Sequence, residues 1–91
     1  MGHIKQNRDV VLARVRRIGG LIAAIERSVE CDAPCGETLH LVAGVRGAIG
    51  GLMEELFEEH LREHVAAPGL SDDERRNGAD ELATLLRRYS K

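Results

Sequence analysis

The sequence predicts an all-α fold with three helices in each chain. Apolar residues recur every three or four positions along most of the 91 residues, which is the spacing of amphipathic helices. No segment alternates apolar and polar residues with the period of two that strands require, and no repeat or low-complexity tract interrupts the pattern. Turn-forming residues near Asp32 and Pro34, and again at Pro68-Gly69, separate the three predicted helices.

The first helix is expected over about residues 4–30. Gly19-Gly20 interrupts its apolar pattern without the turn residues that would end it, so we expect a continuous helix with a local weakness of roughly 1 kcal/mol per glycine relative to alanine. Steps of seven, four, three, four, three and four residues define one apolar stripe, formed by Ile4, Val11, Val15, Ile18, Ile22, Ile25 and Val29.

The second helix is expected over about residues 34–65. Asp32 is a plausible N-cap, Pro34 is tolerated in a first helical turn, and Pro68-Gly69 ends the run. The apolar stripe comprises Val42, Val45, Ile49, Leu52 and Leu56. Small residues are concentrated in the middle of this helix. Glycine lowers the stability of a helix, so a cluster of this kind indicates that another backbone approaches closely, at a helix crossing or a subunit contact. A locally frayed helix is the alternative. The small residues are Ala43, Gly44, Gly47, Ala48, Gly50 and Gly51.

The third helix is expected over about residues 72–89. Ser71 and Glu74 have the spacing of a capping box, which marks a helix start. The short apolar face comprises Leu82, Leu85, Leu86 and Tyr89, and the basic group at the end comprises Arg87, Arg88 and Lys91.

Size and composition favour a single domain over residues 1–91 that forms oligomers. Only Phe57 and Tyr89 are aromatic, and a small chain with long amphipathic helices usually needs partners to cover its apolar faces. No apolar run reaches the roughly 18 to 20 residues of a membrane span, and residues 1–10 are too polar for a signal peptide. We therefore expect a cytoplasmic protein without a membrane partner.

The net charge of −2 conceals a basic first helix. Residues 1–30 hold six Lys and Arg against three acids, whereas residues 31–70 hold two Arg against seven acids. Arg14 and Arg17 lie at i and i+3 beside the apolar stripe, with Arg16 further round the helix. They form either a solubilising face or a phosphate-binding surface for nucleic acid.

Cys35, His60 and His64 are candidate metal ligands on the second helix. The two histidines stand at i and i+4 on one face, and Cys35 points within about 20° of His60. Cys35 nevertheless lies roughly 37 Å away along that helix. One copy cannot close the site, but a second antiparallel copy would bring its own cysteine to the histidines. The spacing thus favours a small helical oligomer with a metal between its chains, although surface helices also carry such histidine pairs by chance.

An antiparallel hairpin of the first two helices would bring His3 to the same end as His60 and His64. A thiolate with imidazoles suits nickel, cobalt, copper or zinc better than calcium or magnesium. His40 falls roughly 200° round the helix from His60, which assigns it to the surface or to packing.

The remaining polar residues have alternative interpretations. The acids near the histidines form a solvated face, or Glu63 or Glu59 orients a ligand imidazole from the second coordination shell; the full set is Glu54, Glu55, Glu58, Glu59 and Glu63. Cys31 is either a disulfide partner of Cys35, a ligand or sensor thiol, or a small buried side chain.

No phosphate-binding loop or nucleophile with an evident base appears, so we do not expect an enzyme.

Five segments together resemble the CsoR/RcnR/FrmR family of bacterial transcriptional repressors, over nearly the whole chain. They are Arg14-Val15-Arg16-Arg17-Ile18-Gly19-Gly20, Cys35, Val45-Arg46-Gly47-Ala48, Gly51-Leu52-Met53 and His60-Leu61-Arg62-Glu63-His64. The resemblance implies three helices, an antiparallel four-helix-bundle dimer core and a tetramer built as a dimer of dimers. It also implies operator-DNA binding without a helix-turn-helix, and effector sites between subunits whose occupation weakens DNA binding. We assign the DNA contacts to Arg14, Arg16, Arg17, Arg46 and Lys91.

The ligand set resembles the nickel- and cobalt-sensing RcnR branch. In that branch the N-terminal amine also binds the metal, and here Gly2 would supply it if Met1 is removed, together with His3, Cys35, His60 and His64. The copper branch would have cysteine at position 64. The formaldehyde branch shares Cys35 and His60 but begins Met-Pro and lacks His64. Leu21 and Gly50 depart from the family pattern, where Gln and Asn respectively are common.

The expected function is therefore a nickel- or cobalt-responsive repressor, with zinc and copper as further ions that the donor set accepts in vitro. One alternative is a formaldehyde-responsive repressor that uses Cys35 and the N-terminal amine. Another is a helical metal-binding or scaffold protein that does not contact DNA.

Overall fold

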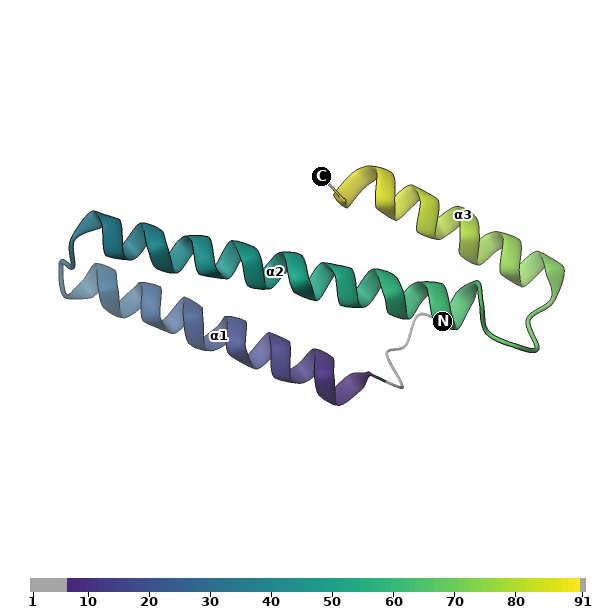
Figure 1. Ribbon diagram of the computed structural model, residues 1–91, viewed down its shortest axis with the longest axis horizontal. Helices are drawn as coiled ribbons and strands as arrows, with labels where there is room; N and C mark the ends of the chain where they lie inside the picture. Colours follow the sequence, from purple (N-terminus) through teal and green to yellow (C-terminus); the bar gives the residue numbers. More distant parts are fainter. Residues whose placement is uncertain (1–6, 91) are drawn as a thin grey trace. The chain divides into compact units, whose positions relative to one another are not determined.

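The computed structural model describes residues 7–90 and contains three α-helices: α1 (Arg8–Glu30), α2 (Cys35–His64) and α3 (Asp72–Tyr89) (Figure 1). No strand occurs among these residues, which confirms the all-α prediction. Two compact units can be distinguished, one formed by residues 8–53 and the other by residues 54–90 with Asn7. The expectation of a single domain over residues 1–91 stays a prediction.

Helix α1 begins later than the apolar pattern predicts. Asn7 lies in a bend and Arg8 is the first helical residue, so the predicted start at residue 4 is wrong; Ile4 lies outside the described residues. The Asn7 side chain donates hydrogen bonds to two carboxylates of α2, those of Glu55 and Glu59. The helix continues through Gly19-Gly20, as predicted.

Asp32 lies in the turn that terminates α1 after Glu30 and is not the N-cap of α2, so the N-cap prediction is wrong. Its φ of 55° is left-handed. The amide of Asp32 donates to the Val29 carbonyl at 3.2 Å, and the amide of Ala33 donates to the Ser28 carbonyl at 3.0 Å. This pair of bonds is a Schellman motif, with Asp32 at the position that glycine usually takes. Pro34 precedes α2, and its carbonyl accepts the first hydrogen bond of that helix from Glu37.

In the unit of residues 8–53, α1 and the first part of α2 form a helical hairpin (Figure 1). The hydroxyls of Ser28 and Thr38 form a 2.6 Å hydrogen bond between the two helices. Val11 is the one apolar side chain in the described chain that is buried, at 7% exposure. This hairpin therefore covers little of its own apolar surface.

The apolar stripe of α1 divides into two sets of residues that differ in burial. Val11 is buried and Ile18 and Ile25 are half-buried, whereas Val15, Ile22 and Val29 are exposed. The exposed positions recur every seven residues on each long helix. They are Val15, Ile22 and Val29 on α1, and Val42, Ile49 and Leu56 on α2.

The small residues in the middle of α2 do not fray the helix, which is unbroken from Cys35 to His64. A Cβ added at Gly44, Gly47 or Gly50 would meet no atom within 4 Å, so no segment of the described chain crosses there. A Cβ at Gly51 would instead lie 2.8 Å from Nη1 of Arg14. A subunit contact at this stripe stays a prediction.

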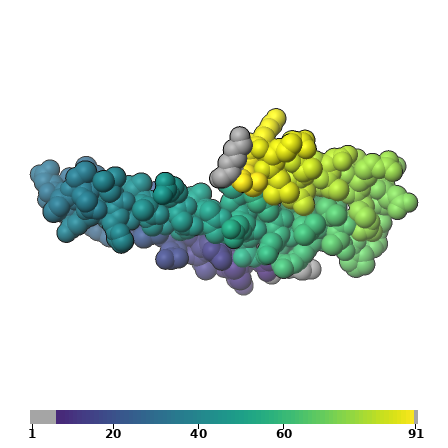
Figure 2. Space-filling model, turned by 45° about the horizontal axis from the view of Figure 1, so that its top comes forward, coloured from purple at the N-terminus to yellow at the C-terminus, as the bar shows by residue number. Residues whose placement is uncertain are grey.

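In the unit of residues 54–90, the last turns of α2 pack against the first half of α3 (Figures 1 and 2). The Arg75 guanidinium donates to the carbonyl of Val65, just beyond α2. Gly69, with φ of 87°, turns the connecting loop. Ser71 and Glu74 form the predicted capping box, and α3 has the predicted bounds. No helix within residues 7–90 is long and apolar enough to cross a membrane.

Candidate effector site

His60 and His64 occupy consecutive turns at the end of α2 and lie side by side. Their ring centroids are 4.8 Å apart and the ring planes are tilted by 48°. The His60 side chain is only 13% exposed. The two histidines form one wall of a pocket of about 250 Å³, whose other residues come from α3 and the loop before it: Leu70, Glu74, Asn77, Gly78 and Glu81.

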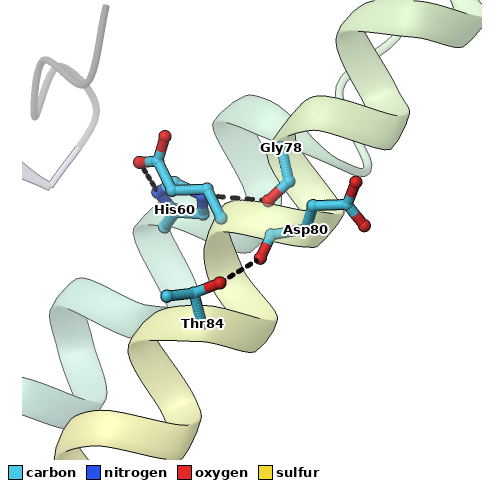
Figure 3. Close-up of polar contacts among 5 residues, drawn as sticks. His60, Gly78, Asp80 and Thr84 are labelled. Atoms are coloured by element: carbon cyan, nitrogen blue, oxygen red, sulfur yellow. Dashed lines mark hydrogen bonds and ion pairs between the residues drawn. The ribbon is translucent and has the colours of Figure 1, made fainter.

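The backbone of α3 orients the His60 ring. Nε2 of His60 lies 3.2 Å from the carbonyl oxygen of Gly78 (Figure 3). A carbonyl oxygen accepts but does not donate, so the hydrogen bond requires a proton on Nε2. In the neutral ring, Nδ1 then carries the lone pair. A backbone carbonyl that fixes the tautomer in this way is a common partner of metal-binding histidines.

The other ring nitrogen of His60 faces a carboxylate. Nδ1 lies 3.7 Å from Oε1 of Glu81, whose side chain is 66% exposed. The lone pair of Nδ1 and a carboxylate oxygen are both donor groups that a metal ion can accept. The site is therefore suited to a cation at Nδ1.

Gly78 allows α3 to approach α2 this closely. It is buried, and a Cβ at this position would overlap the backbone carbonyl of His64. Glycine normally disfavours a helix interior by about 1 kcal/mol, so its presence in α3 is explained by the close approach of the two helices.

Cys35 lies at the other end of the same helix. It is the first residue of α2, His64 is the last, and the Cys35 thiol is exposed. Within residues 7–90, no three His, Cys, Asp or Glu side chains come together in a way that could hold a metal ion. Of the five predicted ligand residues, Gly2 and His3 lie outside the described residues, and the described chain does not bring Cys35, His60 and His64 together.

Asn7 places the start of the described chain at the histidine end of α2. Its Nδ2 donates to Oε2 of Glu55 at 3.2 Å and to Oε2 of Glu59 at 3.1 Å. Glu59 immediately precedes His60. The predicted return of the N-terminus to this end of α2 is therefore supported as far as residue 7.

The acids near the histidines do not form a uniform solvated face. Glu59 is 4% exposed, and its Oε1 has no hydrogen-bond partner. Glu54 and Glu58 are exposed, and Glu63 is half-buried. The carboxylate that faces the His60 ring belongs to Glu81 on α3, and an orienting role for Glu63 stays a prediction.

The predicted DNA-contact residues lie on the hairpin unit, apart from Lys91, which is outside the described residues. Arg14, Arg16 and Arg17 are exposed on α1, and Arg46 is exposed on α2. The Arg14 guanidinium lies over Gly51 of α2, where a Cβ would contact it.

Cys31 is exposed, which excludes its interpretation as a small buried side chain. Its thiol lies 3.6 Å from the carbonyl oxygen of Ser28. It lines a second, more open concavity of about 500 Å³ in the hairpin unit, together with the exposed His40.

Of the two departures from the family pattern, Leu21 is half-buried and Gly50 is exposed.

Three residues of this site, Asn7, Gly78 and Glu81, were not predicted from the sequence. Gly78 carried a signal, because a glycine in the middle of an otherwise good helix usually has a packing reason. Glu81 and Asn7 resemble many other polar residues on helices and turns, so the sequence contained no comparable signal for them.

Comparison with known proteins finds relatives that cover nearly the whole chain. Residues 7–88 match the family model described as a metal-sensitive transcriptional repressor. The transcriptional repressor RcnR of Salmonella arizonae is 30% identical over 91 residues, covering all of both chains. A protein of Serratia marcescens, described only by its place in the bioA 5′ region, is 42% identical over the same length.

A solved structure is similar throughout the fold. It is a variant of the formaldehyde-responsive regulator FrmR from Salmonella enterica serovar Typhimurium, in which a glutamate is replaced by histidine. The TM-score is 0.86 at 40% identity, with 96% of this chain and 98% of that chain covered.

The helical fold and the matched family model define a class, the metal-sensitive transcriptional repressors. The chain belongs to the CsoR/RcnR/FrmR family within that class, as the sequence motifs predict.

Proposed function

We propose that this protein is a nickel- or cobalt-responsive repressor that binds operator DNA without metal and releases it when metal binds between subunits. The observation that supports the proposal is the environment of the two nitrogen atoms of the His60 ring. Its Nε2 is held by the Gly78 carbonyl, and its Nδ1 faces Glu81 beside the His64 ring, so a cation is the natural occupant.

The proposed ligands come from two chains. One chain supplies His60, His64, His3 and the N-terminal amine of Gly2, and a second chain supplies Cys35. Because Cys35 and His64 are opposite ends of one unbroken helix, a second antiparallel copy is the simplest source of the thiolate. Nitrogen donors with one thiolate fit nickel and cobalt, and also zinc and copper in vitro.

The exposed heptad positions support an oligomer. Apolar side chains that recur every seven residues on two neighbouring helices are typical of helices that pack against further helices. We propose an antiparallel four-helix-bundle dimer core and a dimer of dimers in the cytoplasm. Operator DNA would contact the basic residues Arg14, Arg16, Arg17, Arg46 and Lys91.

The proposal is tested by titrating the protein–operator complex with nickel, cobalt, copper, zinc and formaldehyde in turn. Coupling of roughly 1–3 kcal/mol between metal and DNA predicts about a 5- to 150-fold loss of DNA affinity with nickel or cobalt. His64→Ala should remove this response. His40→Ala is the matched control, because His40 is an exposed histidine far from the pocket on the same helix. Release by formaldehyde but by no metal would contradict the proposal.

A formaldehyde-responsive repressor is the second candidate, favoured by the 40% identity to FrmR over nearly the whole chain. In that case the Cys35 thiol and an N-terminal amine would be joined through the formaldehyde carbon as a methylene bridge, with loss of one water. His64→Ala distinguishes the two candidates, since it should leave an aldehyde response nearly intact.

A further inference from the structure

We propose that the concavity between α1 and α2, beside their connecting turn, binds a soft metal ion such as copper(I) through the thiolate of Cys31 and the imidazole of His40. Both residues line this concavity, and all of its lining residues belong to the unit of residues 8–53. It shares no residue with the proposed effector site. The inference therefore goes beyond the proposed function and can be tested independently of it.

The concavity is formed by one face of each helix. Its lining residues recur every three or four positions on α1 and again on α2, and small side chains among them leave a space of about 500 Å³. Gly36 is one of these small residues, and a Cβ at its position would meet no atom within 4 Å. An ion can therefore enter without movement of the backbone.

The side chains of Cys31 and His40 are inclined toward the same level of the hairpin. The 2.6 Å hydrogen bond between the hydroxyls of Ser28 and Thr38 shows that these two positions face each other across the helices. Sγ of Cys31 lies 3.6 Å from the carbonyl oxygen of Ser28, so the thiol is turned back along α1 toward that level. His40 follows Thr38 on α2, and helical side chains lean toward the N-terminus of their own helix. In an antiparallel hairpin, the thiol and the imidazole thus lean toward each other.

The two donor groups select a soft ion. Thiolate sulfur favours copper(I) and imidazole also binds copper, whereas calcium and magnesium require oxygen donors. The Cys31 thiol donates to the Ser28 carbonyl, and its proton is released to water when the metal binds, because the thiolate is the ligand. Copper(I) with one thiolate carries no net charge, so the bound pair costs little desolvation beside small apolar side chains.

A site with two protein donors suits copper(I) better than divalent ions. Within residues 7–90, no three His, Cys, Asp or Glu side chains come together to hold an ion, although Glu37 also lines the concavity. Zinc normally takes four ligands, whereas copper(I) is stable with two. The second thiol near the turn, that of Cys35, is exposed but does not line the concavity, so His40 is the second ligand.

The experiment uses the full-length protein with Cys35→Ser and His64→Ala, which disable the proposed effector site. Copper(I) is supplied without oxygen in competition with a coloured copper(I) chelator, whose absorbance reports the uptake by the protein. This parent protein should bind one copper(I) per chain. Adding Cys31→Ser should abolish binding. Adding His40→Ala should weaken it at least about ten-fold, the loss typical even of a residue that only supports a ligand.

Glu37→Gln is the matched control, because it changes a polar side chain of the same concavity that is not a proposed ligand. It should bind copper(I) as tightly as the parent protein, and circular dichroism checks that every variant keeps its helices. The proposal is overturned if the parent protein takes up no copper(I), or if Cys31→Ser or His40→Ala leaves the uptake unchanged. A loss in Glu37→Gln equal to that in His40→Ala would overturn the site with two donors.

Two further measurements test how the ion is held. Copper X-ray absorption should show one sulfur and one nitrogen neighbour, whereas two sulfurs would indicate thiols from two chains and would reject His40. Because the donors lie on different helices, the ion should connect α1 to α2 and raise the Tm by about 5 °C or more at saturation. An unchanged Tm with copper(I) bound would contradict a bridge between the helices.

Discussion

The two compact units are stabilised in different ways. In residues 54–90, polar groups from separate segments meet, as in the bonds from His60 to Gly78 and from Arg75 to Val65. In residues 8–53, a hydrogen bond between the Ser28 and Thr38 hydroxyls joins the two helices, and apolar side chains lie exposed every seven residues. The unit of residues 54–90 is stabilised by contacts within its own chain, whereas the hairpin leaves apolar positions uncovered.

The largest expected effect is on the α2–α3 contact. Gly78→Ala would place a Cβ on the His64 carbonyl, forcing α3 away from α2 at a cost of about 3 kcal/mol. The change would also withdraw the carbonyl that orients His60. Denaturant unfolding measures the loss. Gly19→Ala is the control, because a Cβ there meets nothing within 4 Å. Equal stability of the two variants would contradict the close approach.

A substitution in the exposed heptad positions should break the proposed oligomer while changing the single chain little. Ile22→Glu and Ile49→Glu alter side chains that are 51% and 42% exposed. Burial of each at a subunit interface would contribute about 2 kcal/mol, which the charge would remove. Sedimentation velocity reports the assembly state. Leu61→Glu is a matched control at 43% exposure outside the heptad positions, and similar dissociation of all three would argue against the proposed interface.

The Ser28–Thr38 bond should contribute about 1 kcal/mol to the hairpin. Ser28→Ala leaves the Thr38 hydroxyl without this partner and should lower the unfolding free energy by that amount. Combining it with Thr38→Val removes both polar groups, so the double variant should lose less than the sum of the two single changes. Thermal unfolding of the four proteins completes the cycle, and strict additivity would mean that the two hydroxyls do not interact.

The smallest effect concerns the start of α3. Hydrogen bonds from the Ser71 backbone amide and then its side chain lower the pKa of Glu74 below its usual 4.5. Because the folded-state pKa is depressed, the stabilisation is present above about pH 4.5 and is lost as the pH falls through the folded-state value. Glu74→Gln should therefore make the free energy of unfolding less dependent on pH between roughly pH 6 and pH 3, where carboxylates titrate. An unchanged profile would exclude this contribution.

Local hydrogen bonding explains which predictions were accurate. The bounds of α3 were predicted because Ser71 and Glu74 cap it within a single turn. The bounds of α2 differ by one residue at each end. The start of α1 was predicted wrongly because Asn7 bonds to residues about 50 positions away, and Asp32 was misassigned because both helix ends favour short polar residues.

The sequence by itself determined the helical class, the family and the donor residues proposed for the effector, because periodicity and side-chain chemistry are properties of the local chain. Only the tertiary structure decided which nitrogen of His60 is held, since its partner Gly78 is 18 residues away on another helix. It likewise decided that Glu59 is buried against Asn7 across 52 residues. Contacts between distant segments depend on how helices pack, and no spacing rule along one helix contains that information.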